Sequence, residues 1–163
     1  MQIRPTKRNE LSLIQHIYTE ARKYMRENGN DQQWVNGYPS DELLINDIQE
    51  GTSYVCLDGA EIVGVFTFAI GEDATYREIY DGKWLNDGLY GVVHRLGSLR
   101  SQKGVGAFCL EWCFQQIPNI KVDTHETNIP MQKMLLKNGY QKCGTIYVND
   151  GTPRVAFQKT RSN

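Results

Sequence analysis

The residues from Ser98 to Gln116 (SLRSQKGVGAFCLEWCFQQ) have the types and spacing of a site that binds an anion. Two glycines, Gly104 and Gly106, lie one residue apart in a turn between an expected strand and an expected helix. The first turn of a helix leaves backbone N–H groups unpaired at the positive end of the helix dipole, so a phosphate can bind there. A Cβ atom at either glycine would hold a pyrophosphate away from these amides. The turn therefore predicts a phosphate site made largely of backbone.

Two common phosphate-binding motifs do not match this turn. A Walker A loop has its lysine directly after a glycine, whereas Lys103 precedes Gly104. The dinucleotide motif Gly-x-Gly-x-x-Gly requires a third glycine where Cys109 stands. On these residues alone, the alternative is a glycine turn that only closes the connection between a strand and a helix.

Two histidines near this turn have the chemistry to move a proton. His94 lies two residues before Leu96, so both side chains are expected on the same face of one strand. His125 ends the next expected strand, within the polar sequence Asp123 to Glu126. An imidazole that titrates near neutral pH suits the removal of a proton from an amine. For each histidine the alternative is a partly buried side chain that is hydrogen-bonded to its neighbours.

The hydrophobic periodicity and the turn residues predict the elements that position these groups. The expected strands span residues 2–5, 53–57, 62–70, 89–99, 120–124, 140–148 and 152–159. The expected helices span residues 11–28, 40–50, 104–116 and 128–138. The order is therefore β-α-α-β-β-β-α-β-α-β-β, which indicates an α/β protein with a central mixed sheet covered by helices.

The length and the composition restrict the class of protein. A chain of 163 residues, of which 40% are hydrophobic, is expected to form a single domain over residues 1–163. Eighteen Lys and Arg against nineteen Asp and Glu give a net charge of −1, which argues against nucleic acid as a partner. The chain has neither an apolar run long enough for a membrane span nor a signal peptide. We expect a cytoplasmic protein that does not bind membranes and is a monomer or a homodimer.

The cysteines agree with a reducing compartment, because the chain has no Cys-x-x-Cys pair and no histidine at a matching zinc spacing. Cys109 and Cys113 lie four residues apart and could share a helix face, but their neighbours are apolar and aromatic. We therefore predict that these two side chains are buried, that all four thiols are reduced, and that there is no metal site. The four residues are Cys56, Cys109, Cys113 and Cys143.

The element order, the turn after the fourth strand, Asn128 and the downstream sequence Lys137 to Tyr140 (KNGY) together resemble the GNAT superfamily of acyl-CoA-dependent N-acetyltransferases. The family's turn reads Arg/Gln-x-x-Gly-x-Gly/Ala. Residues 101–106 (SQKGVG) match both glycines, with Ser101 in the place of Arg or Gln. The resemblance covers nearly the whole chain. It implies the α+β GNAT fold, with a central mixed, mostly antiparallel sheet and helices on both faces.

The resemblance also implies acetyl-CoA as the co-substrate and no metal. The pantetheine arm would lie between the strand that carries Leu96 and Ser98 and the next strand, against the backbone of these two residues. Asn128 would contact the same arm, and it could cap the following helix at the same time. The pyrophosphate would be bound by the backbone amides of Gln102, Lys103, Gly104, Val105 and Gly106.

The catalytic groups are less well defined by the resemblance. Many GNAT enzymes protonate the departing thiolate with a tyrosine in the last helix, and this chain has Leu135 there. A thiol with a pKa of about 8.5 is a tolerable leaving group without an acid, and Tyr140 or Tyr147 could replace the missing one. His94 and His125 are the candidates for the general base or proton relay.

The function implied is transfer of acetyl from acetyl-CoA to a primary amine of a small acceptor, by direct attack in a ternary complex. The alternatives are a GNAT-fold protein that binds CoA as a sensor or partner module without catalysis, and a phosphate-binding fold unrelated to CoA. Aromatic residues in polar segments are expected to give a partly apolar acceptor pocket. These residues are Trp34, Tyr38, Tyr76, Tyr80, Trp84 and Tyr90, of which three lie in the loop from Gly71 to Asp87, an expected lid or pocket wall.

Overall fold

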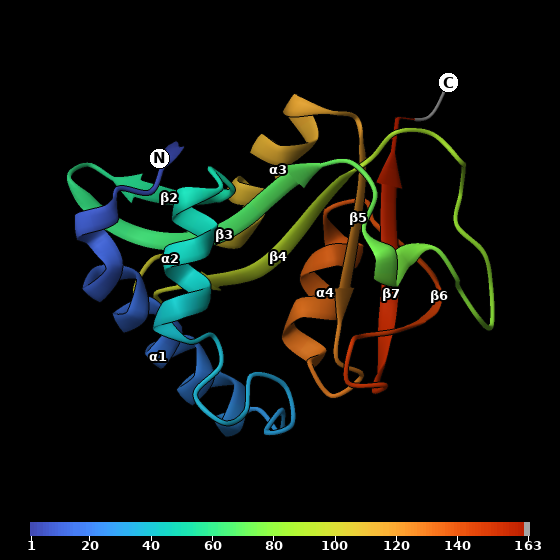
Figure 1. Ribbon diagram of the computed structural model, residues 1–163, viewed down its shortest axis with the longest axis horizontal. Coiled ribbons are helices and arrows are strands. Elements are labelled where there is room, and N and C mark those ends of the chain that lie inside the picture. Colours follow the sequence, from blue (N-terminus) through green and yellow to red (C-terminus); the bar gives the residue numbers. More distant parts are fainter. Residues whose placement is uncertain (162–163) are drawn as a thin grey trace.

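The computed structural model describes residues 1–161 and contains a seven-stranded sheet in the order β1-β2-β3-β4-β5-β7-β6 (Figure 1). The strands are β1 (Gln2–Pro5), β2 (Ser53–Asp58), β3 (Glu61–Ile70), β4 (Gly91–Ser98), β5 (Asn119–Thr124), β6 (Gln141–Tyr147) and β7 (Pro153–Thr160). The α-helices are α1 (Leu11–Glu27), α2 (Asp41–Gln49), α3 (Val105–Gln116) and α4 (Ile129–Lys137), and short 3-10 turns lie at Arg8–Glu10 and Ala74–Tyr76. The predicted order of elements and the α+β class are confirmed.

The sheet opens at its centre, between β4 and β5. These two strands are parallel, whereas every other neighbouring pair is antiparallel. Their pairing joins only Gly91 to Ile120 and Val92 to Lys121. Beyond these residues β4 pairs with β3 alone and β5 with β7 alone, so the strands separate toward their C-terminal ends (Figure 1).

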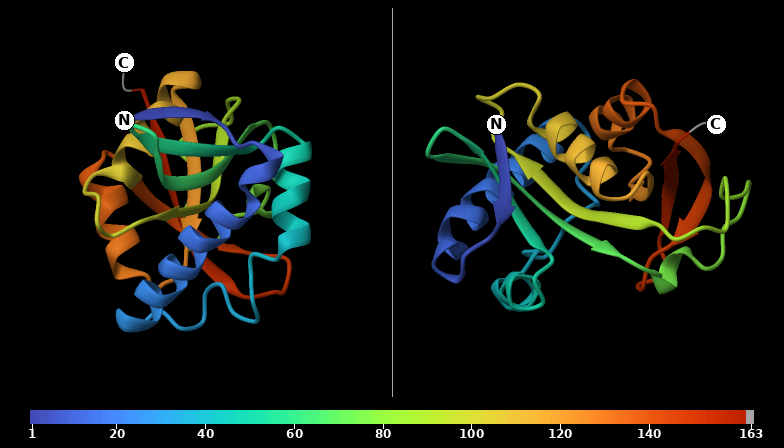
Figure 2. Two further views of the ribbon diagram at one scale, coloured as in Figure 1. Left: turned by 90° about the vertical axis from the view of Figure 1, so that its left-hand side faces the viewer. Right: turned by 90° about the horizontal axis from the view of Figure 1, so that it is seen from above.

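Helices cover both faces of the sheet. Figure 2 shows α1 and α2 on one face and α3 and α4 on the other. Apolar side chains from alternate strand positions pack against each pair of helices, as the period of two predicts. Ile14, Tyr18, Leu44, Val55 and Val65 are buried on the α1–α2 side, and Phe66, Leu110, Val122, Leu135 and Phe157 are buried on the other.

A β-bulge interrupts β4 where the sheet opens. The register with β3 shifts so that Arg95 and Leu96 together lie opposite Phe66. Arg95 has a φ of 51°, in the left-handed region that a residue with a side chain seldom adopts. The bulge breaks the strict alternation of side chains, and His94, Arg95 and Leu96 all line the same cavity.

The bulge is held from the α1–α2 side of the sheet. The hydroxyl of Tyr18 donates a hydrogen bond of 2.7 Å to the carbonyl oxygen of Arg95. The guanidinium of Arg95 forms a two-pronged ion pair with Asp47 on α2, at 2.8 and 3.1 Å, and donates to the hydroxyl of Tyr38 at 3.1 Å. Three elements therefore hold one strained residue in place.

Side-chain caps fix the helices that flank the opening. Oγ of Ser40 accepts the amide of Leu43 at 3.2 Å at the start of α2. Oδ1 of Asn128 accepts the amide of Met131 at 3.2 Å at the start of α4, which confirms the cap predicted for Asn128. No helix within residues 1–161 is long and apolar enough to cross a bilayer.

Candidate functional site

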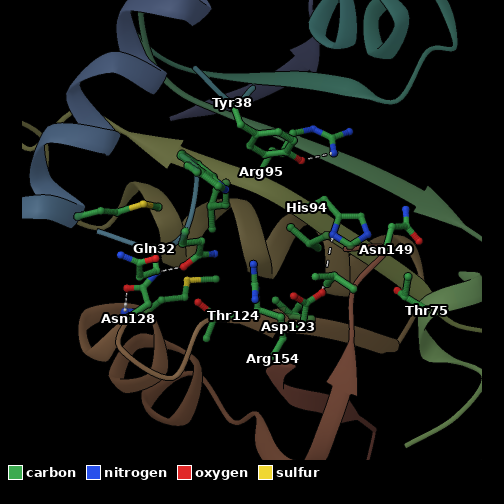
Figure 3. A pocket seen from close by; sticks show the side chains of 18 of the residues that line it. Gln32, Tyr38, Thr75, His94, Arg95, Asp123, Thr124, Asn128, Asn149 and Arg154 are labelled. Atoms are coloured by element: carbon green, nitrogen blue, oxygen red, sulfur yellow. Dashed lines mark hydrogen bonds and ion pairs between the residues drawn. The ribbon is translucent and has the colours of Figure 1, made fainter. Parts of the chain in front are cut away.

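A cavity of about 510 Å³ lies where β4 and β5 separate (Figure 3). The connection from α1 to α2 forms one wall, and β4, β5, the start of α4 and the β6–β7 turn form the others. The polar side chains of the lining include Gln32, Gln33, Asp73, Thr75, His94, Arg95, Asp123, Thr124, Asn128, Asn149, Asp150 and Arg154. Its apolar side chains include Trp34, Val35, Leu96, Val122, Met131 and Val148.

His94 lies in this cavity between two carboxylates. Its Nε2 atom is 2.8 Å from Oδ2 of Asp73, and its Nδ1 atom is 4.0 Å from Oδ2 of Asp123. Asp73 belongs to the loop that follows β3, and Asp123 lies at the end of β5. His94 and Asp123 share a face of the sheet because Val92 and Lys121, two residues earlier on each strand, are paired.

The environment of Asp73 decides which nitrogen of His94 carries the proton. Burial disfavours the charged carboxylate, but hydrogen bonds from His94 and from the hydroxyl and amide of Thr75 outweigh it and lower the pKa of Asp73 to about 2. An ionised carboxylate only accepts hydrogen bonds, so Nε2 must be the donor. In the neutral imidazole the lone pair of Nδ1 then points away from Asp73, on the side of Asp123.

Asp123 is itself held by a buried phenol. The hydroxyl of Tyr76, which is 2% exposed, donates to Oδ2 of Asp123 at 2.6 Å. Burial, followed by the charge of Asp123, raises the pKa of Tyr76 well above its ordinary value. The phenol therefore stays protonated and keeps the carboxylate in position.

The glycine turn directly follows β4. Gly104 has a φ of 77° and precedes the first residue of α3, so it occupies a backbone conformation that suits glycine. The amides of Gly104 and Gly106 donate to no acceptor within residues 1–161. A Cβ atom on Gly106 would lie 2.6 Å from Sδ of Met134, so this glycine also lets α4 approach α3.

The residues predicted to bind the cofactor divide into two groups. Leu96 and Asn128 line the cavity. Ser98 and residues 102–106 are not part of its lining, and they continue from Leu96 along β4 into the turn. The amide nitrogen of the Asn128 side chain donates to Oε1 of Gln33 at 3.2 Å, which ties the start of α4 to the α1–α2 connection.

Thr124 provides a further polar group that has no partner. Its hydroxyl is buried and makes no hydrogen bond within residues 1–161, although the residue lines the cavity. Buried polar atoms in folded proteins nearly always have a partner, so this hydroxyl is free to bind a water molecule or a polar atom of a ligand.

His125 lies outside the lining of the cavity, unlike His94. Its Nδ1 atom accepts the amide of Thr127 at 3.1 Å and lies 2.7 Å from the hydroxyl of the same residue. Burial, with a smaller effect from Arg154, lowers the pKa of His125. These contacts are those of a histidine that shapes the turn before α4.

The predicted aromatic pocket residues are not brought together. Trp34 and Tyr38 line the cavity, and Trp34 also packs edge-on against Tyr18. The other four lie outside this lining, and their role in an acceptor pocket stays a prediction. Trp84 and Tyr90 hold the ammonium of Lys121 at 4.2 and 3.9 Å from their ring centroids, Tyr76 is buried behind Asp123, and Tyr80 packs against Tyr147.

The tyrosines considered as substitutes for Leu135 also lie away from the cavity. Tyr140 is 3% exposed, and burial raises the pKa of its hydroxyl, which has no partner within residues 1–161. Tyr147 is 47% exposed on β6. Leu135 is fully buried in the core between α4 and the sheet.

Several residues of the cavity could not be singled out from the sequence. Asp73 lies in a polar loop, and nothing local shows that it reaches a strand 21 positions away. For three other residues, the available signal was a charged side chain in an otherwise apolar strand. These residues are Arg95, Asp123 and Arg154.

The four cysteines are free and buried. The burial predicted for Cys109 and Cys113 is confirmed, and Cys56 and Cys143 are buried as well. Within residues 1–161 no three His, Cys, Asp or Glu side chains are grouped so that they could hold a metal ion.

Solved structures share this architecture. The chain is similar to a GNAT-family acetyltransferase from Streptococcus agalactiae, with a TM-score of 0.90 and 33% identity over 99% of this chain and 96% of that one. A GNAT acetyltransferase from Listeria monocytogenes has a TM-score of 0.66 at 15% identity, covering 97% and 93% of the two chains. The enzyme AAC(6')-Ib, solved with ribostamycin and coenzyme A, has a TM-score of 0.66 at 18% identity, covering 98% and 93%. No protein-family model and no curated protein matches the sequence.

The divided sheet, the glycine turn and these similarities define an acetyltransferase fold. The identity to the streptococcal protein over nearly the full length of both chains makes the assignment more specific. The chain belongs to the GNAT acetyltransferase family.

Proposed function

We propose that the protein transfers an acetyl group from acetyl-CoA to a primary amine of a small acceptor, by direct attack in a ternary complex. The observation that carries this proposal is the position of His94, in the cavity beside Leu96 and between Asp73 and Asp123. A single domain over residues 1–163 would supply the binding sites for both substrates.

The residues present fit coenzyme A. The free amides of Gly104 and Gly106 suit its pyrophosphate, whereas the amide of Gln102 donates a long hydrogen bond of 3.4 Å to the carbonyl oxygen of Leu99. The orphaned hydroxyl of Thr124 suits a polar atom of its arm or of the acceptor. We assign the pyrophosphate to residues 102–106 and the arm to Leu96, Ser98 and Asn128. When bound, acetyl-CoA supplies a thioester whose acetyl carbon an amine can attack.

His94 would act as the general base. Its Nδ1 atom accepts a proton from the attacking amine as the new N–C bond forms and the C–S bond breaks. Asp73 would stabilise the resulting imidazolium through its hydrogen bond to Nε2. Asp123 would orient the incoming amine, and the sulfur would leave as the thiolate, which needs no acid near neutral pH because the thiol pKa is about 8.5.

The second candidate function is binding of CoA without catalysis, and the buried Leu135 favours it because the usual acid is missing. Calorimetric titration with acetyl-CoA, combined with thiol release in the presence of a panel of amines, separates the two. The proposal requires binding and release that depends on the amine. Tight binding with no release on any amine would favour the sensor. No binding of acetyl-CoA would contradict both functions.

A further inference from the structure

Arg154 is a cation of the cavity wall that has no carboxylate partner. It lies half-buried near the start of β7 and forms no ion pair within residues 1–161. Its Nη1 atom donates to the hydroxyl of Thr152 and to the carbonyl oxygen of Pro153, both at 2.9 Å. The guanidinium has five N–H donors, so most of its hydrogen-bonding capacity is available.

Arg154 shares a face of the sheet with Asp123 and His94. Asp123 pairs with Ala156 across β5 and β7, and Arg154 comes two residues before Ala156. Residues two positions apart on a strand point to the same face, so Arg154 lies on the face of Asp123. The two are diagonal neighbours, with Cα atoms about 7–8 Å apart. Figure 3 shows their side chains in the same part of the cavity, below His94.

The other charged side chains beside His94 already have partners. Asp73 accepts hydrogen bonds from His94 and Thr75 and keeps its negative charge beside the neutral imidazole, and Arg95 is paired with Asp47. These contacts occupy Asp73 and Arg95, so neither is as open to a ligand as Arg154.

Asp150 is the remaining carboxylate of the lining. Its Oδ1 atom accepts hydrogen bonds from the amide and the hydroxyl of Thr152, at 2.9 and 2.6 Å. These bonds, and to a smaller extent the charge of Arg154, lower the pKa of Asp150, but the two side chains form no ion pair within residues 1–161. Within residues 1–161 Asp123 accepts one hydrogen bond, from the phenol of Tyr76, and Nδ1 of His94 lies 4.0 Å from it. Asp123 and Arg154 are therefore two opposite charges of the cavity that can still bind a ligand.

We propose that the acceptor is a small amino acid, which carries a carboxylate as well as the amine. Arg154 binds the carboxylate through paired hydrogen bonds, and Asp123 holds the ammonium beside Nδ1 of His94. The apolar part of the lining, including Trp34 and Val148, suits an apolar side chain. This inference rests on the proposed acetyltransferase function.

The test compares matched acceptors. Initial rates of thiol release from acetyl-CoA are measured with the common L-α-amino acids, β-alanine and 4-aminobutyrate, each against its carboxamide, and with spermidine and tryptamine as amines without an anion. We expect at least one amino acid to exceed its carboxamide about 30-fold in kcat/KM, the loss typical of a truncated charge pair.

Variants then identify the side chain that binds the carboxylate of the acceptor. Arg154→Ala should abolish the preference by raising KM about 30-fold while kcat changes little, and Arg154→Lys should restore part of it. Lys142→Ala, which removes one positive charge from an exposed site on β6, is the matched control and should behave as wild type. Thermal unfolding of each variant checks that the hairpin contacts of Arg154 are not essential to the fold.

The outcomes separate this inference from the proposed function. Turnover of tryptamine or spermidine with no preference for any acid over its amide overturns the inference and leaves the acetyltransferase intact. An equal loss in Arg154→Ala for acids and amides also overturns it. If no amine is turned over, the proposed function fails. Calorimetric titration of the same amino acids into the complex with CoA then tests the inference by itself. Binding of an amino acid that requires both its carboxylate and Arg154 supports the inference, and its absence contradicts it.

Discussion

The Nε2 atom of His94 lies 2.8 Å from Oδ2 of Asp73, on a loop that leaves the sheet after β3. This hydrogen bond fixes the proton on Nε2 and leaves Nδ1 as the nitrogen that can accept one. In the function we propose, His94 would be the base, and Asp73 would act through it as a positioning residue.

The first prediction concerns Asp73 and pH. Its pKa is about 2 in the folded protein and about 3.9 in an unfolded chain, so its carboxylate stabilises the fold above pH 4, and this contribution is lost as pH falls from about 4 to about 2. Asp73→Asn should lower the free energy of unfolding at pH 7 by about 2 kcal/mol, and the difference should shrink below pH 4. Urea unfolding across this range measures it, with Asp58→Asn at the exposed end of β2 as the control. A difference that is constant with pH would contradict the assignment.

The second prediction concerns the orphaned hydroxyl of Thr124. Thr124→Val keeps the shape and removes a buried polar group without a partner, so the free protein should become about 1 kcal/mol more stable. The Kd for acetyl-CoA or for the acceptor should rise about fivefold, because the ligand loses a hydrogen bond. The control is Thr67→Val, which should destabilise the protein because the Thr67 hydroxyl donates to the carbonyl of His94 at 3.0 Å. Loss of stability in Thr124→Val would show that its hydroxyl has a structural partner.

The third prediction concerns the ion pair that supports the bulge. Asp47→Ala leaves the guanidinium of Arg95 mostly buried, at 16% exposure, without its partner, and should cost about 3 kcal/mol of stability. Asp47→Ala combined with Arg95→Met should recover most of this loss, since removing both charges leaves no unpaired ion. Chemical denaturation measures both. A double variant no more stable than the single one would mean that Asp47 acts through something other than Arg95.

The fourth prediction concerns the glycine turn. Gly106→Val should raise the Kd for acetyl-CoA at least about tenfold, because a side chain would screen the free amides from a phosphate. The same side chain also meets Met134, so Gly106→Val combined with Met134→Ala is needed to relieve the crowding. The double variant should regain thermal stability and stay weak in binding. If the double variant recovers both thermal stability and acetyl-CoA binding, Gly106→Val acts through the packing of α3 against α4.

The sequence predicted the elements well because periodicity and turn residues are local signals. Each of these signals depends on residues only a few positions apart. Examples are the Asp58-Gly59 hairpin, the caps Ser40 and Asn128, and the glycine turn. The separation of β4 from β5 was predicted only from the family resemblance. No local sequence pattern indicates over how many residues two parallel strands pair.

The cavity was harder to predict because tertiary contacts redirect individual side chains. The left-handed conformation of Arg95 has no signal in its residue type, and it brings consecutive residues into one wall. Trp84 and Tyr90 were assigned to a pocket, whereas they surround Lys121, a lysine that is 4% exposed on an inner strand. A lysine is expected at the surface, so its aromatic cage could not be anticipated.

The assignment of His94 as the base is tested most directly by the rate of thiol release from acetyl-CoA with the best acceptor of the amine panel. His94→Ala should lower kcat at least about 100-fold, the usual contribution of a general base, and leave the Kd for acetyl-CoA within about twofold. His125→Ala, a histidine outside the lining of the cavity, should change neither value. A wild-type rate in His94→Ala would contradict the assignment of His94. A larger loss of rate in His125→Ala than in His94→Ala would contradict it as well.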